Sequence, residues 1–222
     1  MRPMDFQRAR SNEQREMRRA RILAVTSEML EEMPVAKVSL NELSRRVGLA
    51  KSNVLRYFES REAVLLQLLD AELHEWAAQV DAWLVESPAD CLERIAQVAD
   101  VVASSIAERP VMCDLISAQS AVLERNISTE VAVQHKYAIA GEVETITRAM
   151  VRALPELSNE QAWQVVAYTI LLTAGAWPQS RPAPAIQAAY DLEPDLAAGQ
   201  MDFTETLRDL IRVTITGLLA SA

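Results

Sequence analysis

Residues 38–61 constrain the fold of this chain more than any other stretch, because two short helical patterns meet there at a glycine. Ser39 and Glu42, three residues apart, predict a capping box and a helix that begins directly after Ser39. Gly48 ends this helix, since glycine readily takes the left-handed backbone conformation of a tight turn. The apolar spacing predicts a second helix over 51–58. Two short helices joined in this way form a helix-turn-helix.

Polar side chains are expected to cover the exposed side of the second helix. Val54 and Phe58, four residues apart, point to the core, so the other positions face solvent. Their cationic, hydroxyl, amide and aromatic groups suit contacts with phosphates, base edges and sugars in a major groove, and a hydroxyl at a helix N-terminus suits a phosphate. The predicted DNA-contacting residues are Ser39, Arg45, Lys51, Ser52, Asn53, Arg56, Tyr57 and Arg61.

The first third of the chain resembles the DNA-binding signature of the TetR family of bacterial transcription regulators. The turn is formed by Val47–Ala50, the second helix ends in the aromatic pair Tyr57–Phe58, and residues 60–65 match the start of the family's long fourth helix. Leu55 stands where the family often has a contacting tyrosine, and Arg61 replaces the common lysine. Arg61 keeps the positive charge, whereas Leu55 offers only contact with a thymine methyl group.

The resemblance implies an all-α fold of about nine helices, in which an N-terminal three-helix helix-turn-helix DNA-binding domain precedes a C-terminal helical ligand-binding and dimerisation domain. We expect a flexible basic arm over 1–12, the DNA-binding domain over 13–59, and the effector-binding and dimerisation domain over 60–222. The resemblance further implies a homodimer through about 159–177 and 203–219. Such a dimer binds a palindromic operator in double-stranded DNA as a repressor and is released by a small-molecule effector.

Caps, prolines and apolar spacing predict the helices along the whole chain. Ser87 with Pro88 is expected to start one helix, and Ser158 with Gln161 forms a second capping box. The density of prolines predicts a loop over 178–202, with a short turn near 185–190, and no stretch alternates apolar and polar residues as a strand does. The expected helices span about 13–33, 40–47, 51–58, 60–86, 87–109, 111–124, 129–154, 158–177 and 203–219.

The net charge of −9 hides an uneven distribution of charged residues. Residues 1–61 hold 13 Lys and Arg against 8 Asp and Glu, whereas residues 62–222 hold 9 against 23. A basic head on an acidic body suits a protein that docks one end on phosphates. The basic residues of the arm either add phosphate contacts or stay solvated, and the same alternatives hold for Arg45 and Arg46.

The resemblance also places an effector pocket in the body of the protein. Large aromatic, sulfur-containing and polar side chains there are able to line such a pocket, but each is also explained as ordinary core, because such residues fill helical cores by default. The candidate pocket residues are Trp76, Trp83, Met112, Gln119, His135, Tyr137, Tyr168 and Trp177.

Other classes of function find little support in the sequence. No enzyme is expected, because the chain has no Ser-His-Asp set, no Cys/His cluster and no glycine-rich phosphate loop. Cys91 and Cys113 form no metal-ligand pattern with the histidines, so neither a metal nor a cofactor is expected, and the thiols are interpreted as idle or, alternatively, as a redox switch. No apolar run reaches the roughly 18 residues that span a bilayer, so we expect a cytoplasmic protein without a membrane partner. The contrasting hypothesis is a helical protein-interaction module with a non-functional DNA head.

Overall fold

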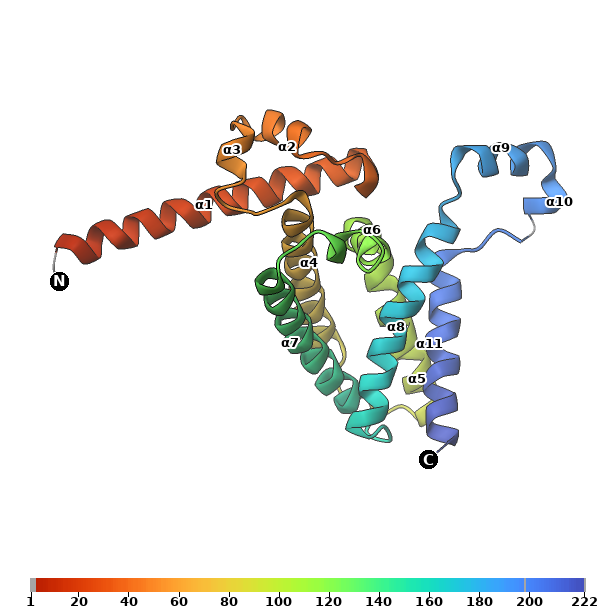
Figure 1. Cartoon of the computed structure of the whole chain (residues 1–222). Coiled ribbons are helices and arrows are strands. Elements are labelled where there is room, and N and C mark those ends of the chain that lie inside the picture. The colour runs from red at the N-terminus through yellow and green to blue at the C-terminus, as the bar shows by residue number, and fades with distance from the viewer. Residues whose placement is uncertain (1–2, 198, 222) are drawn as a thin grey trace. The chain divides into compact units, whose positions relative to one another are not determined.

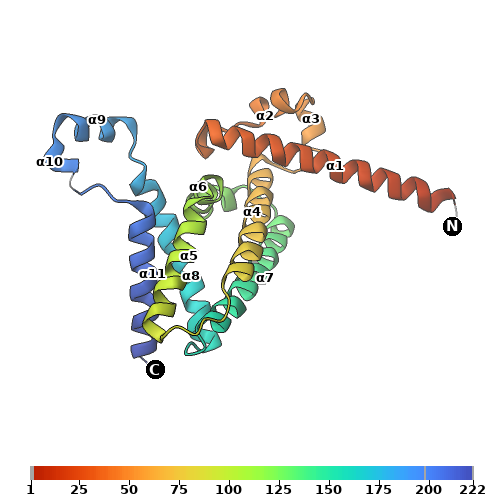
Figure 2. The same cartoon turned by 180° about the vertical axis from the view of Figure 1, so that it is seen from behind.

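The structure, a computed structural model, describes residues 3–197 and 199–221, with side chains from residue 13 onward except that of Pro194. These residues form α-helices, two short 3-10 helices and no strand, which confirms the all-α fold (Figure 1, Figure 2). Within this described part of the chain the α-helices number eleven, against about nine expected. The chain divides into two compact units. Unit 1 comprises the residues up to Asp70 together with Ala118–His135, and unit 2 comprises Ala71–Ser117 and the residues from Lys136 onward.

The helices divide between the two units as follows. Unit 1 contains α1 (Pro3–Glu32), α2 (Leu40–Val47) and α3 (Lys51–Val54), with the 3-10 helices η1 (Val35–Lys37) and η2 (Leu123–Arg125). Two long helices, α4 (Arg61–Trp83) and α7 (Thr129–Ala153), begin in unit 1 and continue into unit 2. The helices of unit 2 are α5 (Cys91–Ala107), α6 (Pro110–Ala118, its last residue in unit 1), α8 (Asn159–Ser180), α9 (Pro184–Leu192), α10 (Pro194–Ala197) and α11 (Phe203–Ala220).

Helix α1 begins at Pro3, earlier than the predicted start near Glu13. Proline suits the first position of a helix, and the residues that follow it include no further proline and no glycine, so nothing in the sequence ends the helix early. The helix thus takes in most of the predicted basic arm. Residues 1–2 of that arm, and the side chains of the rest, lie outside the described residues.

The first helices of the chain contribute side chains to the hydrophobic core of unit 1. Helix α1 packs against α2, and α2 against α3. Ile22 and Met29 of α1, Leu43 of α2, Val54 of α3 and Leu65 of α4 have no exposed surface. The predicted core positions of the second helix, Val54 and Phe58, are therefore confirmed as buried.

Prolines begin helices in this chain more often than they end them. Pro110, Pro184 and Pro194 are the first residues of α6, α9 and α10, where a missing N–H costs nothing because that group has no partner within the helix. Pro178 lies inside α8, which continues to Ser180. The expected loop over 178–202 is therefore wrong over much of its length, since α9 and α10 occupy it.

Some helix ends also differ from the predictions. Helix α5 begins after Asp90, whose carboxylate accepts the Glu93 N–H at 2.9 Å, and not at Ser87. An ionised carboxylate makes a stronger cap than a hydroxyl. Helix α3 stops at Val54 and a turn follows it, although Phe58 is buried as predicted. Helices α4 and α6 likewise end before their predicted last residues.

Helix α11 packs against both α5 and α8 in unit 2, which the two opposite views of the chain also show (Figure 1, Figure 2). Leu207, Ile211 and Ile215 form its buried stripe at intervals of four residues. The predicted capping box of α8 is present, with both Ser158 and Gln161 bonded to backbone N–H groups. Within the described part of the chain, no helix has the combined length and apolar character needed to cross a membrane.

Trp76 is expected to be a major source of stability in unit 2. Its side chain is 1% exposed, and its Nε1–H donates to Ser105 Oγ at 3.0 Å. Trp76→Ala should lower the free energy of unfolding by about 3–5 kcal/mol, because it leaves a large cavity. Denaturant titration measures this change. Trp83→Ala, on the same helix but 49% exposed, is the control, and an equal loss in both variants would contradict the assignment of Trp76 to the core.

Candidate nucleic-acid interface

The turn between α2 and α3 depends on Gly48. This residue has a φ of 75° and a ψ of 27°, the left-handed region that side chains other than glycine rarely adopt. Its N–H donates to the Arg45 carbonyl at 3.3 Å, and the Leu49 N–H donates to the Ser44 carbonyl at 3.0 Å. The Ser44 and Arg45 carbonyls near the end of α2 are thus satisfied within the turn, and α3 begins three residues after Gly48 at Lys51.

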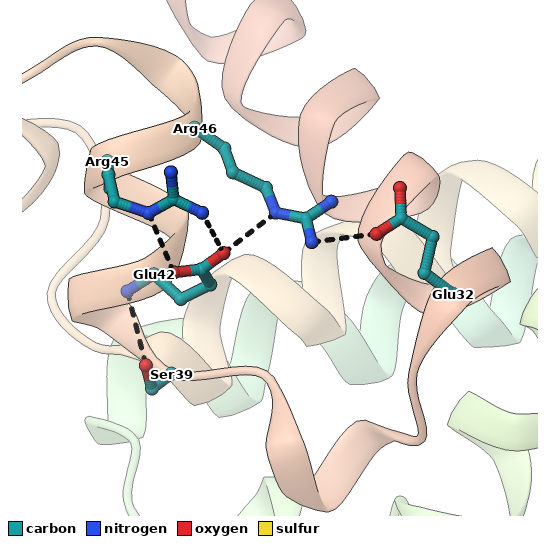
Figure 3. Close-up of polar contacts among 5 residues, drawn as sticks. All are labelled: Glu32, Ser39, Glu42, Arg45 and Arg46. Atoms are coloured by element: carbon teal, nitrogen blue, oxygen red, sulfur yellow. Dashed lines mark hydrogen bonds and ion pairs between the residues drawn. The ribbon is translucent and has the colours of Figure 1, made fainter.

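At the N-terminus of α2, one of the two hydrogen bonds of a capping box is present (Figure 3). Ser39 Oγ accepts the Glu42 N–H at 3.2 Å, as predicted. The Glu42 carboxylate bonds to Arg45 and Arg46 and does not return to the Ser39 backbone, so the predicted reciprocal capping box is only half formed. Guanidinium groups offer a carboxylate stronger, charge-assisted hydrogen bonds than a neutral backbone N–H does.

Glu42 is the centre of an ion-pair network (Figure 3). Arg45 donates to both of its carboxylate oxygens, at 3.0 and 2.6 Å, and Arg46 Nε donates at 3.0 Å. Arg46 also pairs with Glu32 at the end of α1, at 2.7 Å. The hydrogen bonds from Arg45, and then those from Arg46, lower the pKa of the Glu42 carboxyl to about 2. The network joins α2 to α1 and engages two of the cations of the head.

Five of the predicted DNA-contacting residues lie on α3 or the turn that follows it. Lys51, Ser52 and Arg56 are exposed, and Asn53 and Tyr57 are half-buried. Among the residues that the structure describes, none forms an ion pair with Lys51 or Arg56. These two cations are therefore available to an external anion.

The other three predicted contacts are already engaged. Ser39 caps α2, and Arg45 is bonded to Glu42, although its side chain is still 72% exposed. Arg61 is 21% exposed and donates to the Val38 carbonyl at 2.9 Å and to Glu62 at 3.1 Å. Arg61 thus holds the segment before α2 to the start of α4, a structural function that the sequence analysis did not predict.

Arg19 was missed by the sequence analysis as a residue of this site. It donates to the Tyr57 carbonyl at 2.7 Å and to Gln67, and its guanidinium lies 4.6 Å from the centre of the Phe58 ring. These contacts fix the end of the segment that carries Lys51 and Arg56. The usable signal was its position three residues before the buried Ile22, which places Arg19 beside the core stripe of α1.

Glu59 is a second residue that the sequence analysis missed. Its carboxylate accepts the Ser128 N–H at 2.6 Å, while Ser128 Oγ caps α7 by accepting the Val131 N–H at 3.2 Å. The turn after α3 is therefore bonded to the start of α7 within unit 1.

The eight candidate pocket residues are divided between the two units. Gln119 and His135 belong to unit 1, where they bond to each other at 3.1 Å and His135 bonds to Asp70 at 2.5 Å. In unit 2, Trp76, Met112 and Trp177 are core residues, and Tyr137 and Tyr168 are exposed. Trp83 alone of the eight lines a cavity described within unit 2.

The thiol of Cys113 fits the interpretation as an idle group. It is fully buried, and burial, followed by the neighbouring Asp114 carboxylate, raises the pKa of this thiol to about 12. A thiol that stays protonated is a poor nucleophile. No group of three or more potential ligands within the described residues is placed to hold a metal ion.

The fold and the site together define an all-helical protein with a helix-turn-helix head. Residues 22–68 match the family model for bacterial regulatory proteins of the tetR family, and residues 70–222 match that for the tetracyclin repressor-like C-terminal domain. The chain therefore belongs to the TetR family.

Two curated relatives agree with this assignment, and each aligns with only part of this chain. The HTH-type transcriptional regulator EthR of Mycobacterium tuberculosis is 39% identical over 69 residues, 31% of this chain and 32% of that protein. EthR of Mycolicibacterium smegmatis is 30% identical over 93 residues, 42% of this chain and 43% of that protein. The aligned part thus spans about a third to less than half of these curated relatives.

Solved structures share the fold over nearly the whole chain. A possible TetR family transcriptional regulator from Streptomyces coelicolor has a TM-score of 0.60 at 16% identity, covering 92% of this chain and 100% of that one. FadR from Bacillus subtilis in complex with stearoyl-CoA has a TM-score of 0.54 at 13% identity, covering 89% and 98%. Identities this low support a common fold only.

The Glu42 network predicts a pH-dependent contribution to stability. The pKa of Glu42 lies at about 2 in the folded protein against an ordinary 4.5, so its contribution is complete above pH 4.5 and is lost as the pH falls toward 2. Wild type should therefore exceed Glu42→Gln in stability at about pH 6, and the two should converge near pH 2. Urea midpoints at several pH values test this.

Glu31→Gln, which alters an exposed carboxylate one residue from Glu32, is the matched control for this comparison. It should follow wild type at every pH. A constant gap between wild type and Glu42→Gln down to pH 2 would contradict the network.

Proposed function

We propose that this chain is a dimeric transcription regulator that binds a palindromic DNA operator through the segment from Lys51 to Tyr57. The observation that carries the proposal is the pair of exposed cations, Lys51 and Arg56, that have no ion-pair partner among the described residues and follow the turn at Gly48. A short helix with free cations, an amide and a hydroxyl suits readout in the major groove. The basic charge of residues 1–61 favours approach to phosphates.

Dimerisation is proposed through α8 and α11. Large apolar side chains are exposed on both helices: Trp163 and Leu171 on α8 are 53% and 68% exposed, and Val213 on α11 is 66% exposed. Apolar side chains that gather on one surface are typical of an interface. We call the segment from Lys51 to Tyr57 the reading segment. A two-fold dimer would place its two reading segments about one turn of DNA apart, at about 34 Å, which suits a palindrome.

Release by a small molecule is the proposed regulation. An effector that binds more tightly to the DNA-incompetent state shifts the protein away from the operator, and by linkage the operator weakens effector binding by the same factor. FadR from Bacillus subtilis, which shares this fold, has been solved with stearoyl-CoA. We propose a ligand in unit 2 of this chain as well, with repression as the direction of control and no catalytic activity.

The reading segment is tested by selection of duplexes from a random DNA pool. Wild type should recover a palindrome. Lys51→Ala and Arg56→Ala should change the preferred base at one position in each half-site, because a bidentate base contact is worth about 1–3 kcal/mol of discrimination. Tyr57→Ala should weaken binding to all sequences alike. Recovery of no motif by wild type would favour the interaction-module hypothesis.

Arg61→Ala needs a separate expectation, because Arg61 is bonded to Val38 and Glu62. It should weaken binding to all sequences, like Tyr57→Ala, and should also lower the thermal stability of the protein. Weaker binding with unchanged stability would assign Arg61 to phosphate contact alone.

The dimer is tested by placing a charge on its proposed surface. Leu171→Glu buries an unpaired carboxylate if α8 is at the interface, and should raise the dimer dissociation constant by about 100-fold or more. Sedimentation equilibrium measures this constant. Leu192→Glu on α9, which alters a leucine that is 79% exposed, is the control and should remain dimeric. A Leu171→Glu variant as dimeric as the control would rule out the α8 interface.

A further inference from the structure

A buried histidine joins three segments of unit 1. His135 on α7 is 1% exposed, and its Nδ1 lies 2.5 Å from Asp70 Oδ1 on α4. Its Nε2 lies 3.1 Å from Gln119 Nε2, in the turn that leads to η2, and 3.9 Å from Glu124 Oε1 in η2. All four residues belong to unit 1, and we call them the His135 cluster.

The partners of the imidazole determine where its hydrogen lies in the neutral form. An ionised carboxylate only accepts hydrogen bonds, so Nδ1 carries the hydrogen that Asp70 accepts. Gln119 Nε2 donates one of its two hydrogens to Glu124 Oε1 at 2.9 Å. Its other hydrogen is directed to His135 Nε2, which therefore has to be an acceptor. The cluster thus holds a neutral imidazole with its hydrogen on Nδ1.

A proton on Nε2 is incompatible with this arrangement. The imidazolium is a donor at both nitrogens, so Nε2 and the Gln119 amide nitrogen would be two donors that face each other. Glu124 Oε1, 3.9 Å from Nε2, can approach and accept a charge-assisted hydrogen bond, which is stronger than a neutral one. Glu124 then exchanges its bond to Gln119 for a bond to His135.

The surroundings of His135 suit a group that gains and loses a proton. Among the described residues, the charged groups that face the imidazole are Asp70 from α4 and Glu124 from η2, and one turn away on α7 itself residues 131, 132, 138 and 139 are apolar. Two carboxylates compensate the positive charge that the ring acquires with a proton. Their side chains are 22% and 27% exposed, so a proton from solvent has a route to the buried ring.

A movement of Glu124 acts on the turn after α3. Glu124 precedes Ser128 by four residues, and the Ser128 N–H donates to the Glu59 carboxylate at 2.6 Å. Glu59 directly follows Phe58, which is the buried end of the segment that carries the reading segment. All these residues lie within unit 1. Bonded groups therefore connect the His135 cluster to the turn that holds the proposed DNA contacts.

We propose that the His135 cluster is a proton switch. The neutral imidazole holds Gln119, whereas the protonated imidazole takes Glu124 and rearranges the segment that leads to Ser128. Histidine ordinarily changes its charge between about pH 5 and 8, so the switch responds to pH in that range. The switch lies within unit 1 and stands apart from the proposed function, whereas control of operator binding by the switch rests on that function.

His135 can be observed by itself, because the chain has only two histidines. The other one, His74, is 73% exposed and is removed by His74→Gln. In this variant of the full chain, labelled with nitrogen-15, NMR at about pH 8 should show a hydrogen on Nδ1 and none on Nε2. On acidification to about pH 5.5, Nε2 should gain a proton, and the backbone amide signals of Glu124 and Ser128 should shift with the same midpoint.

Two further substitutions in the same background should move this midpoint in opposite directions. Glu124→Gln removes the carboxylate that the protonated ring takes, and should lower the midpoint by about one pH unit or more. Gln119→Met removes the donor that stabilises unprotonated Nε2, and should raise the midpoint by about half a pH unit. Glu130→Gln alters an exposed carboxylate in the first turn of α7, and is the control that should leave the midpoint unchanged.

Several results would overturn the proposal. These are a hydrogen on Nε2 at about pH 8, a ring whose protonation does not change down to about pH 5.5, a Ser128 amide that does not follow the ring, and a Glu124→Gln midpoint equal to that of Glu130→Gln. The measurements contain no DNA, so a protein that binds no operator can still show the switch. Operator selection at one pH, in turn, is unaffected by a failure of the switch.

Discussion

The arrangement of the head depends on one backbone conformation, the left-handed turn at Gly48. It allows α2 to end with the Ser44 and Arg45 carbonyls satisfied and α3 to begin three residues later, so that Leu43 and Val54 are both buried. No side chain occupies the space where a Cβ would stand, so the backbone angle itself is what favours glycine. Once that turn is set, Val54 and Phe58 face inward and Lys51 and Arg56 face solvent. The same turn thereby supplies both the packing and the proposed contact surface.

Bonds within unit 1 distinguish four arginines of the head from the two cations of the segment 51–57. Arg45, Arg46, Arg61 and Arg19 bond to carboxylates, carbonyls or an aromatic ring within unit 1 and hold its segments together. Lys51 and Arg56 have no such partner among the described residues. The positive charge counted from the sequence therefore overstates what is free to meet phosphates. A contact from Arg45 would have to replace its bonds to Glu42, whose carboxylate remains charged down to a pH of about 2.

Local signals were predictable from the sequence, and long-range partners were not. The caps at Ser39 and Ser158 and the turn at Gly48 involve residues within a few positions of each other, so spacing alone identified them. The pairing of Arg46 with Glu32 and of Glu59 with Ser128 joins distant segments, and many arginines and acids of the chain fit such a pattern equally well. Prolines were ambiguous for a different reason: the same residue begins a helix or ends one, and the sequence did not distinguish the two cases at Pro184 and Pro194. For the candidate pocket residues the sequence left two interpretations open, because large apolar side chains line pockets and also fill cores, as Trp76 and Met112 do.

The central claim is that the free cations of the reading segment bind DNA phosphates and bases. It is tested most directly by the salt dependence of affinity for the selected duplex, measured for wild type and for a variant with both Lys51→Ala and Arg56→Ala. A dimer with about six or more phosphate contacts should lose about a thousandfold in affinity between about 50 and 200 mM salt, and the variant should show a shallower slope. An affinity that barely responds to salt, or a variant with the slope of wild type, would contradict the account.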